Sequence, residues 1–329
     1  MRVVLLLVCL LLVASCGGDD GKTREIWIYT SIYPSVIARM EPVLAARFPD
    51  VRFQWYQKGS EQVAARLSME MEAGGTPCDL LMTSDPFYYA ELHAVERLLA
   101  YESPAARDVP DDLRDPDFAW TTVRIPVMVL GVNPSKLDGL EPPQGFSDLT
   151  DPAYRGLVSM GDPLKSGTNF TTVASLAYDE DWSLLEGWGA NDLIAAGGNS
   201  AVLQRLESGE RPIGVILLEN LLPRIAADAP LRVVYPDDGA VPIPSPIAIL
   251  ASSSEPDLAK QVYDAMFSDE IQAAIVAGHM YSPLPGRSPP EGARPWEELA
   301  LAPWDAAFVS WVRDRRSEIK QRFREILRR

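Results

Sequence analysis

The chain has 329 residues, 47% of them hydrophobic, and a formal net charge of −16 at pH 7. A surface this acidic repels phosphate backbones, so the composition argues against nucleic acid as a partner. The length is sufficient for one large or two medium α/β lobes with packed cores.

The first residues predict export. An unbroken apolar run, Val3 to Val13, leads into Ala14-Ser15-Cys16. The run is shorter than the roughly 20 residues that span a bilayer, so residues 1–15 are predicted to form a cleaved signal peptide. The small residues before Cys16 resemble the lipobox of bacterial lipoproteins, which predicts Cys16 as a lipidated N-terminus and residues 16–23 as a polar tether. An ordinary signal peptide, cut within the same motif, is the alternative.

Loss of residues 1–15 removes one arginine and no acidic residue, which leaves 29 basic and 46 acidic residues and a net charge of −17. Of the three cysteines, Cys9 lies in the predicted signal peptide and Cys16 in the lipobox, so Cys78 is alone. An exported chain without an internal disulfide depends on a packed core for its stability.

The next part of the chain alternates predicted strands and helices. Strand patterns cover residues 25–30, 51–56 and 78–82, and helix patterns cover residues 36–48, 60–73 and 86–98. This order predicts a parallel sheet with helices on both faces.

Polar loops follow all three predicted strands. Ligands of such sheets bind beyond the carboxyl ends of the strands. The candidate binding residues in these loops are Ser31, Tyr33, Ser60, Ser84 and Asp85. Helix capping is the alternative for each one, above all for Ser60 and Asp85, but three such loops at one sheet edge favour a binding cleft.

A second α/β unit follows a β-rich run at residues 121–137, where the chain is predicted to cross into a second lobe. Its predicted elements are a strand at 157–160, a helix after 169, a helix from Trp182 to Ala195, a helix from Ala201 to Leu206 and a strand at 213–217. A Pro-rich extended segment at 239–256 is predicted to cross back, so a hinge joins two lobes around a cleft. The predicted lobes are residues 24–124 plus about 244–285, and residues 125–243 plus about 286–329.

The segment Ser166-Gly167-Thr168-Asn169 directly precedes an apolar-periodic run. A helix N-terminus offers unpaired N–H groups and about half a positive charge, so it favours an anion. Gly167 lets the backbone approach closely, and the two hydroxyls add donors. Asn199-Ser200 has the same form before the next helix and is predicted to face the same anion. A helix cap that binds nothing is the alternative for both.

The mature chain resembles the extracellular solute-binding proteins of ABC importers, in the branch of ferric-ion, 2-aminoethylphosphonate and sugar-phosphate binders. The segments that carry the resemblance include "CDLLMTSD", "RIPVMVLGVNPSKL", "FSDLTDPAYRGLVSMGDPLKSGT" and "GGNSAVLQRLESGERPIGVILLEN". It implies a type II periplasmic-binding-protein fold, with two doubly wound α/β lobes joined by a two-crossing hinge, and an anionic group held at residues 166–169.

The same resemblance implies a location and partners. The protein is expected at the cell envelope, on the periplasmic face or the outer surface of a membrane, as a lipid-anchored monomer. It would deliver a small solute to an ABC permease and its ATPase. No cofactor is predicted.

The solute class is inferred from departures within the branch. Ferric-ion binders use a neighbouring tyrosine pair with a histidine and a carboxylate, whereas the matching segment here reads "VILLENLLPR", with Glu219 and no tyrosine. Tyr33 stands where the histidine is expected. Acidic side chains near an anion cradle suit an ammonium or hydroxyl group of the solute. A phosphonate or phosphate ester is therefore predicted; Fe³⁺ as cargo, with Tyr88-Tyr89 as the tyrosine pair, is the alternative.

Two other functional classes are alternatives to a transport binding protein. His93 and His279 lie in apolar, helical contexts, and no Ser-His-Asp arrangement or catalytic-metal spacing is evident, so we expect no enzymatic activity. A sensory binding partner would close in the same way and would differ only in the receptor that it contacts.

The stretch from Trp304 to Arg329 is predicted to be a helix whose apolar stripe docks on a lobe. From Arg313 onward it holds eight basic and three acidic residues in an otherwise acidic protein. A solvated basic face is expected, with contact to lipid head groups as the alternative.

Overall fold

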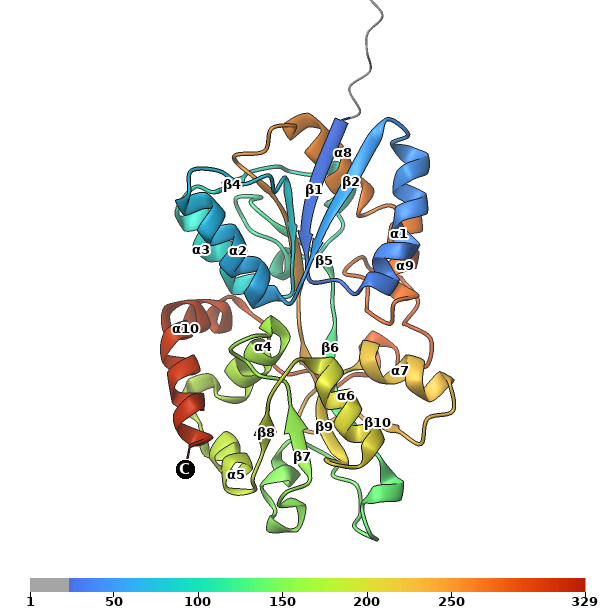
Figure 1. Cartoon of the computed structure of the whole chain (residues 1–329), viewed down its shortest axis with the longest axis vertical. Helices are drawn as coiled ribbons and strands as arrows, with labels where there is room; N and C mark the ends of the chain where they lie inside the picture. Colours follow the sequence, from blue (N-terminus) through green and yellow to red (C-terminus); the bar gives the residue numbers. More distant parts are fainter. Residues whose placement is uncertain (1–23, 329) are drawn as a thin grey trace, which may run out of the picture.

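The computed structural model describes residues 24–328, so the predicted signal peptide, the lipidation of Cys16 and the tether lie outside the described residues. Figure 1 shows two lobes stacked along the long axis, each with a central sheet and helices around it. No helix within residues 24–328 combines the length and the apolar character that a membrane crossing requires.

The sheet of the first lobe has the order β2-β1-β3-β12-β4, with β5 paired to β12. Its strands are β1 (Arg24–Thr30), β2 (Val51–Gln57), β3 (Leu80–Met82), β4 (Leu98–Leu99), β5 (Thr121–Arg124) and β12 (Ser245–Leu250). β1 pairs parallel with β2 and β3, whereas β12 runs antiparallel to β3. The predicted parallel pairing is therefore confirmed for β1 to β3. The sheet is mixed because β12, which the prediction did not cover, enters the lobe from the opposite end.

Helices cover both faces of this sheet. They are α1 (Pro34–Arg47), α2 (Ser60–Glu72), α3 (Pro86–Ala94), α8 (Pro256–Ala265) and α9 (Asp269–Val276). Successive strand residues point to opposite faces, so Ile28 packs in the core shared with α1, α8 and α9, and Tyr29 packs in the core shared with α2 and α3. This two-sided burial explains the continuous apolar character of the strand sequences.

The sheet of the second lobe has the order β10-β6-β9-β7-β8, with β11 paired to β6. Its strands are β6 (Val127–Val132), β7 (Val158–Met160), β8 (Ile194–Ala195), β9 (Ile213–Leu217), β10 (Arg232–Val234) and β11 (Val241–Pro242). Here β7 runs parallel to β8 and β9, and β6 runs antiparallel to β9. Both lobes are thus built on mixed sheets.

The helices of the second lobe are α4 (Gly167–Leu176), α5 (Ser183–Ala190), α6 (Asn199–Ser208), α7 (Leu218–Ala226) and α10 (Ala306–Ile326). The predicted helix from Trp182 to Ala195 is too long. α5 ends at Ala190, Asp192 adopts a positive φ of 57° that turns the chain, and the next residues form β8.

The chain crosses between the lobes at β5 to β6 and at β11 to β12, as predicted, and a third time after α9. In the third crossing, Tyr281 bridges to Ile125 beside the first crossing, and Leu301 bridges to Ala240 in the second lobe. The two-crossing hinge thus gains a third connection, and the predicted lobe boundary at about residue 286 already required the chain to cross there.

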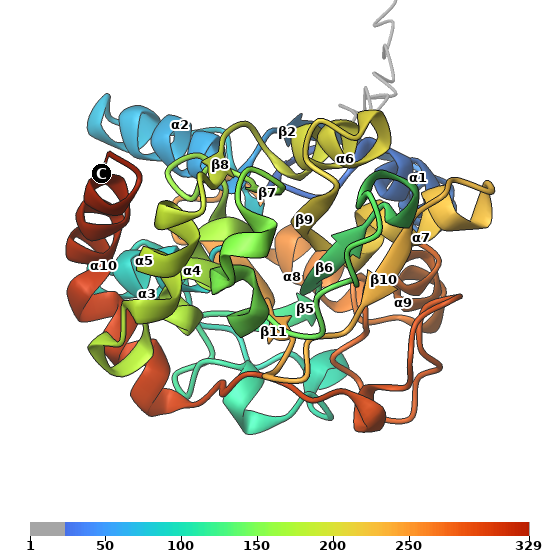
Figure 2. The same ribbon diagram turned by 90° about the horizontal axis from the view of Figure 1, so that it is seen from below.

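Helix α10 docks on the second lobe, which confirms the prediction for the C-terminal stretch. Its apolar stripe is buried in the core of this lobe and consists of Phe308, Val312, Ile319, Phe323 and Ile326. The Asp305 carboxylate caps the helix by accepting the Phe308 N–H at 2.8 Å. Figures 1 and 2 show α10 along one edge of the molecule, next to α3 and α5.

Candidate ligand-binding site

A cavity of about 310 Å³ lies between the two lobes. The first lobe lines it with Ser31, Tyr33, Gln57, Lys58, Gly59, Ser60, Gln62 and Ser84. The second lobe lines it with Lys165, Ser166, Thr168, Gly197, Gly198, Asn199, Ser200, Leu217 and Glu219. These residues end or follow β1, β2 and β3 in one lobe and β7, β8 and β9 in the other. The cavity is therefore at the carboxyl ends of the parallel strands of both sheets, where α/β sheets bind ligands.

The N-terminus of α4 forms one wall of the cavity. Ser166 precedes the helix in an extended conformation, and its carbonyl accepts the first helical bond, from the Phe170 N–H at 2.9 Å. The N–H groups of residues 167–169 precede Phe170 in the first turn, so they have no carbonyl partner within the helix. Such a wall presents N–H donors and the positive end of the helix dipole to a ligand.

Two buried asparagines hold the starts of α4 and α6 together. Asn169 Nδ2 donates to Ser166 Oγ and to Asn199 Oδ1, each at 3.0 Å, and Asn169 Oδ1 accepts the Gly161 N–H at 3.0 Å. Asn199 Nδ2 donates to Thr168 Oγ1 at 3.1 Å. Asn169 was predicted to contact the solute, but it does not line the cavity; it fixes the residues that do.

The same bonds orient the hydroxyls of this wall. Ser166 Oγ and Thr168 Oγ1 lie 3.0 Å apart, and each accepts a hydrogen bond from one of the asparagines. A hydroxyl has one donor and two acceptor positions. Because one hydroxyl of this pair can donate to the other, the remaining proton is available to a ligand in the cavity.

Three serines of the first lobe face this wall. Ser31 Oγ accepts the Ser84 N–H at 3.0 Å and an Arg124 N–H at 3.2 Å. Ser60 Oγ also accepts from the Ser84 N–H, at 3.3 Å. Gly59, and not Ser60, occupies the N-cap position of α2, so the capping alternative for Ser60 is wrong. Ser31 Oγ and Ser84 Oγ also lie 3.3 Å apart, so one of these two hydroxyls donates to the other, and the remaining proton and that of Ser60 are available to the cavity.

Arg124 places a positive charge behind the serines. Its side chain is 1% exposed, and Nη2 donates to Ser84 Oγ at 2.8 Å. Burial lowers the pKa of Arg124, and the charge of Glu219 opposes that effect. Sequence reasoning missed Arg124, although it is the single charged residue between residues 121 and 132 and so carried a visible signal.

Glu219 lines the opposite part of the cavity. Its Oε2 atom is buried and has no hydrogen-bond partner within residues 24–328. Burial raises the pKa of this carboxyl from 4.5 to about 7, and the positive charge of Arg124 limits the rise. An unpartnered buried carboxyl at a cavity wall is costly unless a ligand pairs with it.

Tyr33 connects the two lobes beside Glu219. Its hydroxyl accepts a hydrogen bond from Asn220 Nδ2 at 3.1 Å. Burial and the nearby charge of Glu219 raise the pKa of the Tyr33 phenol to about 12. Tyr33 is therefore a neutral phenol at pH 7.

The predicted Asp85 does not line the cavity. It is 1% exposed and forms an ion pair with Arg316 of α10. Gly167 is also outside the lining, since it packs against the loop after β3. Of the other predicted residues, Ser31, Tyr33, Ser60, Ser84, Ser166, Thr168, Asn199, Ser200 and Glu219 all line the cavity. Sequence reasoning missed the lysines Lys58 and Lys165, which add positive charge to it.

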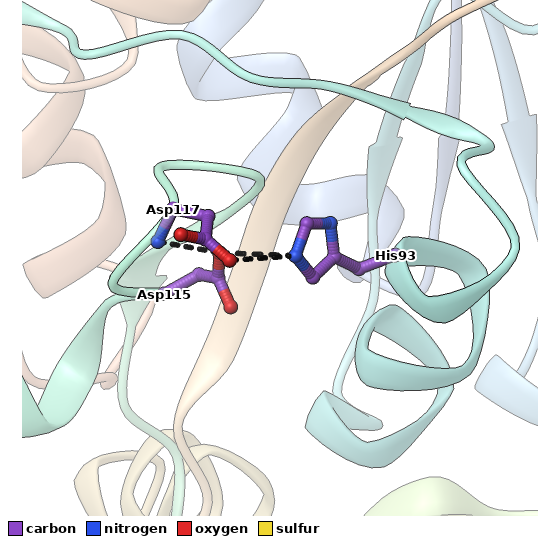
Figure 3. A group of neighbouring side chains, drawn as sticks. All are labelled: His93, Asp115 and Asp117. Atoms are coloured by element: carbon purple, nitrogen blue, oxygen red, sulfur yellow. Dashed lines mark hydrogen bonds and ion pairs between the residues drawn. The ribbon is translucent and has the colours of Figure 1, made fainter.

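Potential metal ligands gather elsewhere. Within residues 24–328, one group has His, Cys, Asp or Glu ligand atoms close enough to share an ion: His93, Asp115 and Asp117. Figure 3 shows His93 Nε2 facing Asp117 Oδ2, at 3.2 Å. Asp115 Oδ2 accepts the N–H groups of Asp117 and Ala119, so it closes a turn of the first lobe. None of the three residues lines the cavity.

The adjacent tyrosines Tyr88 and Tyr89 are in the core of the first lobe. Tyr89 accepts the Thr83 N–H at 2.7 Å and donates to the Pro246 carbonyl at 2.9 Å, and burial raises its pKa. The Tyr88 hydroxyl shares a hydrogen bond with Ser68 Oγ at 3.0 Å. The pair has a packing role here and does not line the cavity.

Comparison with known proteins places this architecture in a family. The family model for bacterial extracellular solute-binding proteins matches residues 77–308. The chain belongs to the bacterial extracellular solute-binding protein family. The sequence is also 29% identical, over 274 residues, to the phosphoglycerate transport regulatory protein PgtC of Salmonella typhimurium. That alignment covers 79% of this chain and 66% of PgtC, so the chain spans just under two thirds of the length of that relative.

Solved structures of solute-binding proteins share the fold. The periplasmic binding protein AfuA from Actinobacillus pleuropneumoniae, with fructose-6-phosphate bound, aligns with a TM-score of 0.81 at 21% identity and covers 92% of this chain and 98% of its own. Iron-bound HitA from Pseudomonas aeruginosa aligns with a TM-score of 0.79 at 20% identity and covers 91% and 99%. The predicted two-lobed, type II periplasmic-binding-protein fold is confirmed.

Proposed function

We propose that this solute-binding protein serves an ABC importer and that its cleft holds a small solute with a phosphate or phosphonate group. The observation that carries the proposal is the convergence of donors from both lobes on one cavity. The start of α4, with Ser166 and Thr168, faces Ser31, Ser60 and Ser84, and Arg124 stands behind the serines. This arrangement suits a compact anion with several acceptor oxygens.

Glu219 supports a second feature of the solute. A carboxyl with a buried, unpartnered oxygen can accept from an ammonium or hydroxyl group, or donate to an oxygen when it is protonated. A solute with an anionic end and a hydrogen-bonding end would satisfy both walls of the cavity. Aminophosphonates and phosphorylated hydroxy compounds have this form.

The names of similar proteins agree with a phosphate ester. PgtC is named for phosphoglycerate transport, and the AfuA structure contains fructose-6-phosphate. HitA contains iron, but the lining of this cavity offers a single phenol, Tyr33, and a single carboxyl, Glu219. Hard Fe³⁺ favours anionic oxygen ligands, so this site suits a phosphorus oxyanion better.

The remaining parts of the proposal concern location and partners. The exported, monomeric protein would be anchored to the membrane through Cys16 and would deliver the solute to a permease and its ATPase. A role in binding and not in catalysis fits the cavity, because its lining lacks histidine and cysteine and offers one carboxyl, Glu219.

Thermal unfolding tests this proposal with the chain from Gly17 onward, which contains all the described residues. The panel would contain phosphate, 2-aminoethylphosphonate, phosphoglycerate, several sugar phosphates, and Fe(III) citrate with and without carbonate. A solute at 100 times its Kd stabilises the protein by about 2.7 kcal/mol, which raises the Tm by a few degrees. We expect a phosphorus compound to produce this shift.

The variant Ser166→Ala/Thr168→Ala should abolish the shift. Thr172→Val is the matched control, because the Thr172 hydroxyl is on the same helix but donates to the Thr168 carbonyl at 2.9 Å and not to the cavity. A shift with Fe(III) alone, or a phosphorus-induced shift that the double variant retains, would contradict the proposal.

A further inference from the structure

The basic face of α10 is turned toward the first lobe, although its apolar stripe is packed in the second. Arg316 and Lys320 lie on this face, and their carboxylate partners all belong to the first lobe. The expectation of a solvated basic face is thus wrong at these two positions. The partners are Glu61 in α2, Asp85 before α3 and Glu91 within α3.

Arg316 holds three carboxylates at once. Its Nη2 lies 3.0 Å from Glu61 Oε1 and also pairs with Asp85 Oδ2, and its Nη1 lies 2.9 Å from Glu91 Oε1. Lys320 adds a second contact to Glu61 Oε1, at 2.9 Å. The forked guanidinium can bridge two carboxylates in a way that an ammonium cannot.

Two of these carboxylates adjoin residues of the cavity. Glu61 follows Ser60, and Asp85 follows Ser84. On its other side, the Arg316 guanidinium lies 5.4 Å from the centroid of the Phe170 ring in α4, close to the start of that helix. Arg316 thus contacts α2, α3 and α4, the three helices whose N-terminal ends carry Ser60, Ser84, Ser166 and Thr168.

Apolar contacts strengthen the same junction. Phe87 of α3 is fully buried in the core of the second lobe. The centroid of its ring lies 5.8 Å from that of Phe170 and 6.1 Å from that of Phe308. The Arg316 side chain is 12% exposed, and Asp85 is 1% exposed. Since surface ion pairs contribute little and buried ones are costly to break, the Arg316–Asp85 pair is the energetically important contact of this set.

We propose that Arg316 is a positioning residue for the cleft: it ties the Ser60-Glu61 and Ser84-Asp85 segments to α10 and α4 and so sets the spacing of the hydroxyls that face the solute. The role of these hydroxyls in binding rests on the proposed function. The positioning itself does not, and it can be measured in the protein without solute.

Hydrogen exchange measured by mass spectrometry tests the positioning directly. In Arg316→Gln, amides of residues 58–64 and 83–88 should exchange at least ~10-fold faster than in the wild type, because local opening there becomes easier. Amides of β6 and β9 should be unchanged. The matched control is Arg322→Gln, since Arg322 is on the same helix but pairs with Glu186 of the second lobe at 2.7 Å.

A second variant separates positioning from the cost of a buried charge. Arg316→Gln leaves Asp85 unpaired and can lower global stability, whereas Arg316→Gln/Asp85→Asn removes both charges. We expect the double variant to regain global stability and to keep fast exchange in both segments. Wild-type exchange in the double variant, or equally fast exchange in Arg322→Gln, would overturn the proposal.

Solute binding provides an independent readout. The phosphorus compound with the largest thermal shift should bind Arg316→Gln/Asp85→Asn at least ~10-fold more weakly and Arg322→Gln with unchanged affinity. Unchanged affinity of the double variant would also overturn the positioning role. If no compound of the panel binds the wild type, the proposed function fails and the exchange measurement still decides the role of Arg316.

Discussion

Gly167 lies directly against Ser84 across the boundary between the lobes. A Cβ atom at position 167 would stand 2.6 Å from the Ser84 carbonyl oxygen, and also 2.9 Å from Asp85 Cβ. Cβ atoms essentially never come within 3.0 Å of a heavy atom of a residue that is not a neighbour in the chain. The absence of a side chain at position 167 therefore permits α4 to reach the serines of the first lobe.

We expect Gly167→Ala to hinder this contact and to weaken binding of the phosphorus compound at least ~10-fold. The backbone itself tolerates alanine, because Gly167 starts a helix, where alanine has the higher propensity. The Tm of the protein without solute should change little if the lobes can separate slightly. Isothermal calorimetry and thermal unfolding give the two quantities.

Gly75→Ala is the control for this prediction, since a Cβ atom at position 75 would have no neighbour within 4 Å. Wild-type affinity in Gly167→Ala would show that solute binding does not need the close approach of α4 to Ser84.

A second prediction concerns pH and Glu219. Its pKa is about 7 in the folded protein, against an ordinary value of 4.5, so between these values the folded state binds more protons than the unfolded state. The free energy of unfolding therefore falls as pH rises from 4.5 to about 7. Glu219→Gln removes this loss and should be about 1–3 kcal/mol more stable than the wild type at about pH 8.

Urea unfolding of both proteins at several pH values checks the Glu219 prediction. Glu186→Gln serves as the control, because Glu186 is an acidic residue of the same lobe that does not line the cavity. A pH-independent difference between Glu219→Gln and the wild type would contradict the assigned titration.

Local sequence patterns correctly predicted the elements whose structure depends on residues close together in the sequence. The alternation of strands and helices between β1 and α3 follows from hydrophobic periodicity. The direction of β12 was beyond this kind of reasoning, because it depends on pairing with β3, which is distant in the sequence. The prediction also failed locally at Asp192, because the helical pattern of the sequence does not indicate the positive φ that turns the chain there, just after α5.

The sequence predicted those residues of the site that directly follow a strand or begin a helix. Ser31 and Ser84 follow from the rule that ligands bind at carboxyl ends, and Ser166 follows from the anion preference of a helix N-terminus. Asp85 has the same sequence context but pairs with Arg316, which is 231 positions away. Burial and pairing at this distance leave no signal in the local sequence, so the sequence predicts Asp85 inside the cleft although it lies beside it.

A third prediction addresses iron. Fe(III) citrate should produce no visible phenolate charge-transfer band, because the cavity lining provides a single phenol, Tyr33, and a single carboxyl, Glu219, as oxygen ligands that could become anionic. Absorption spectra with and without carbonate measure this. A band that disappears in Tyr33→Phe and persists in Tyr235→Phe would establish iron binding at the cleft and contradict a phosphorus-specific site.

The last prediction uses Cys78, which is the one cysteine of the chain from Gly17 onward. Its side chain is fully buried, Sγ donates to the Leu80 carbonyl at 3.4 Å, and burial raises the pKa of the thiol. Because the thiolate is the reactive form, a thiol reagent should label Cys78 only after the first lobe opens. Val95→Cys, at a position that is 62% exposed in the wild type, should add a thiol that reacts at once.

The labelling rate of Cys78 also shows whether the first lobe opens with release of the solute or while the cleft stays occupied. If labelling requires an opening that releases the solute, a phosphorus compound at 100 times its Kd should slow it about 100-fold. We expect this slowing, because Cys78 shares a core with Tyr89, whose hydroxyl bonds the Thr83 N–H next to Ser84. A solute-independent rate would show that this core opens while the cleft stays occupied, and rapid labelling of the native protein would contradict the burial of Cys78.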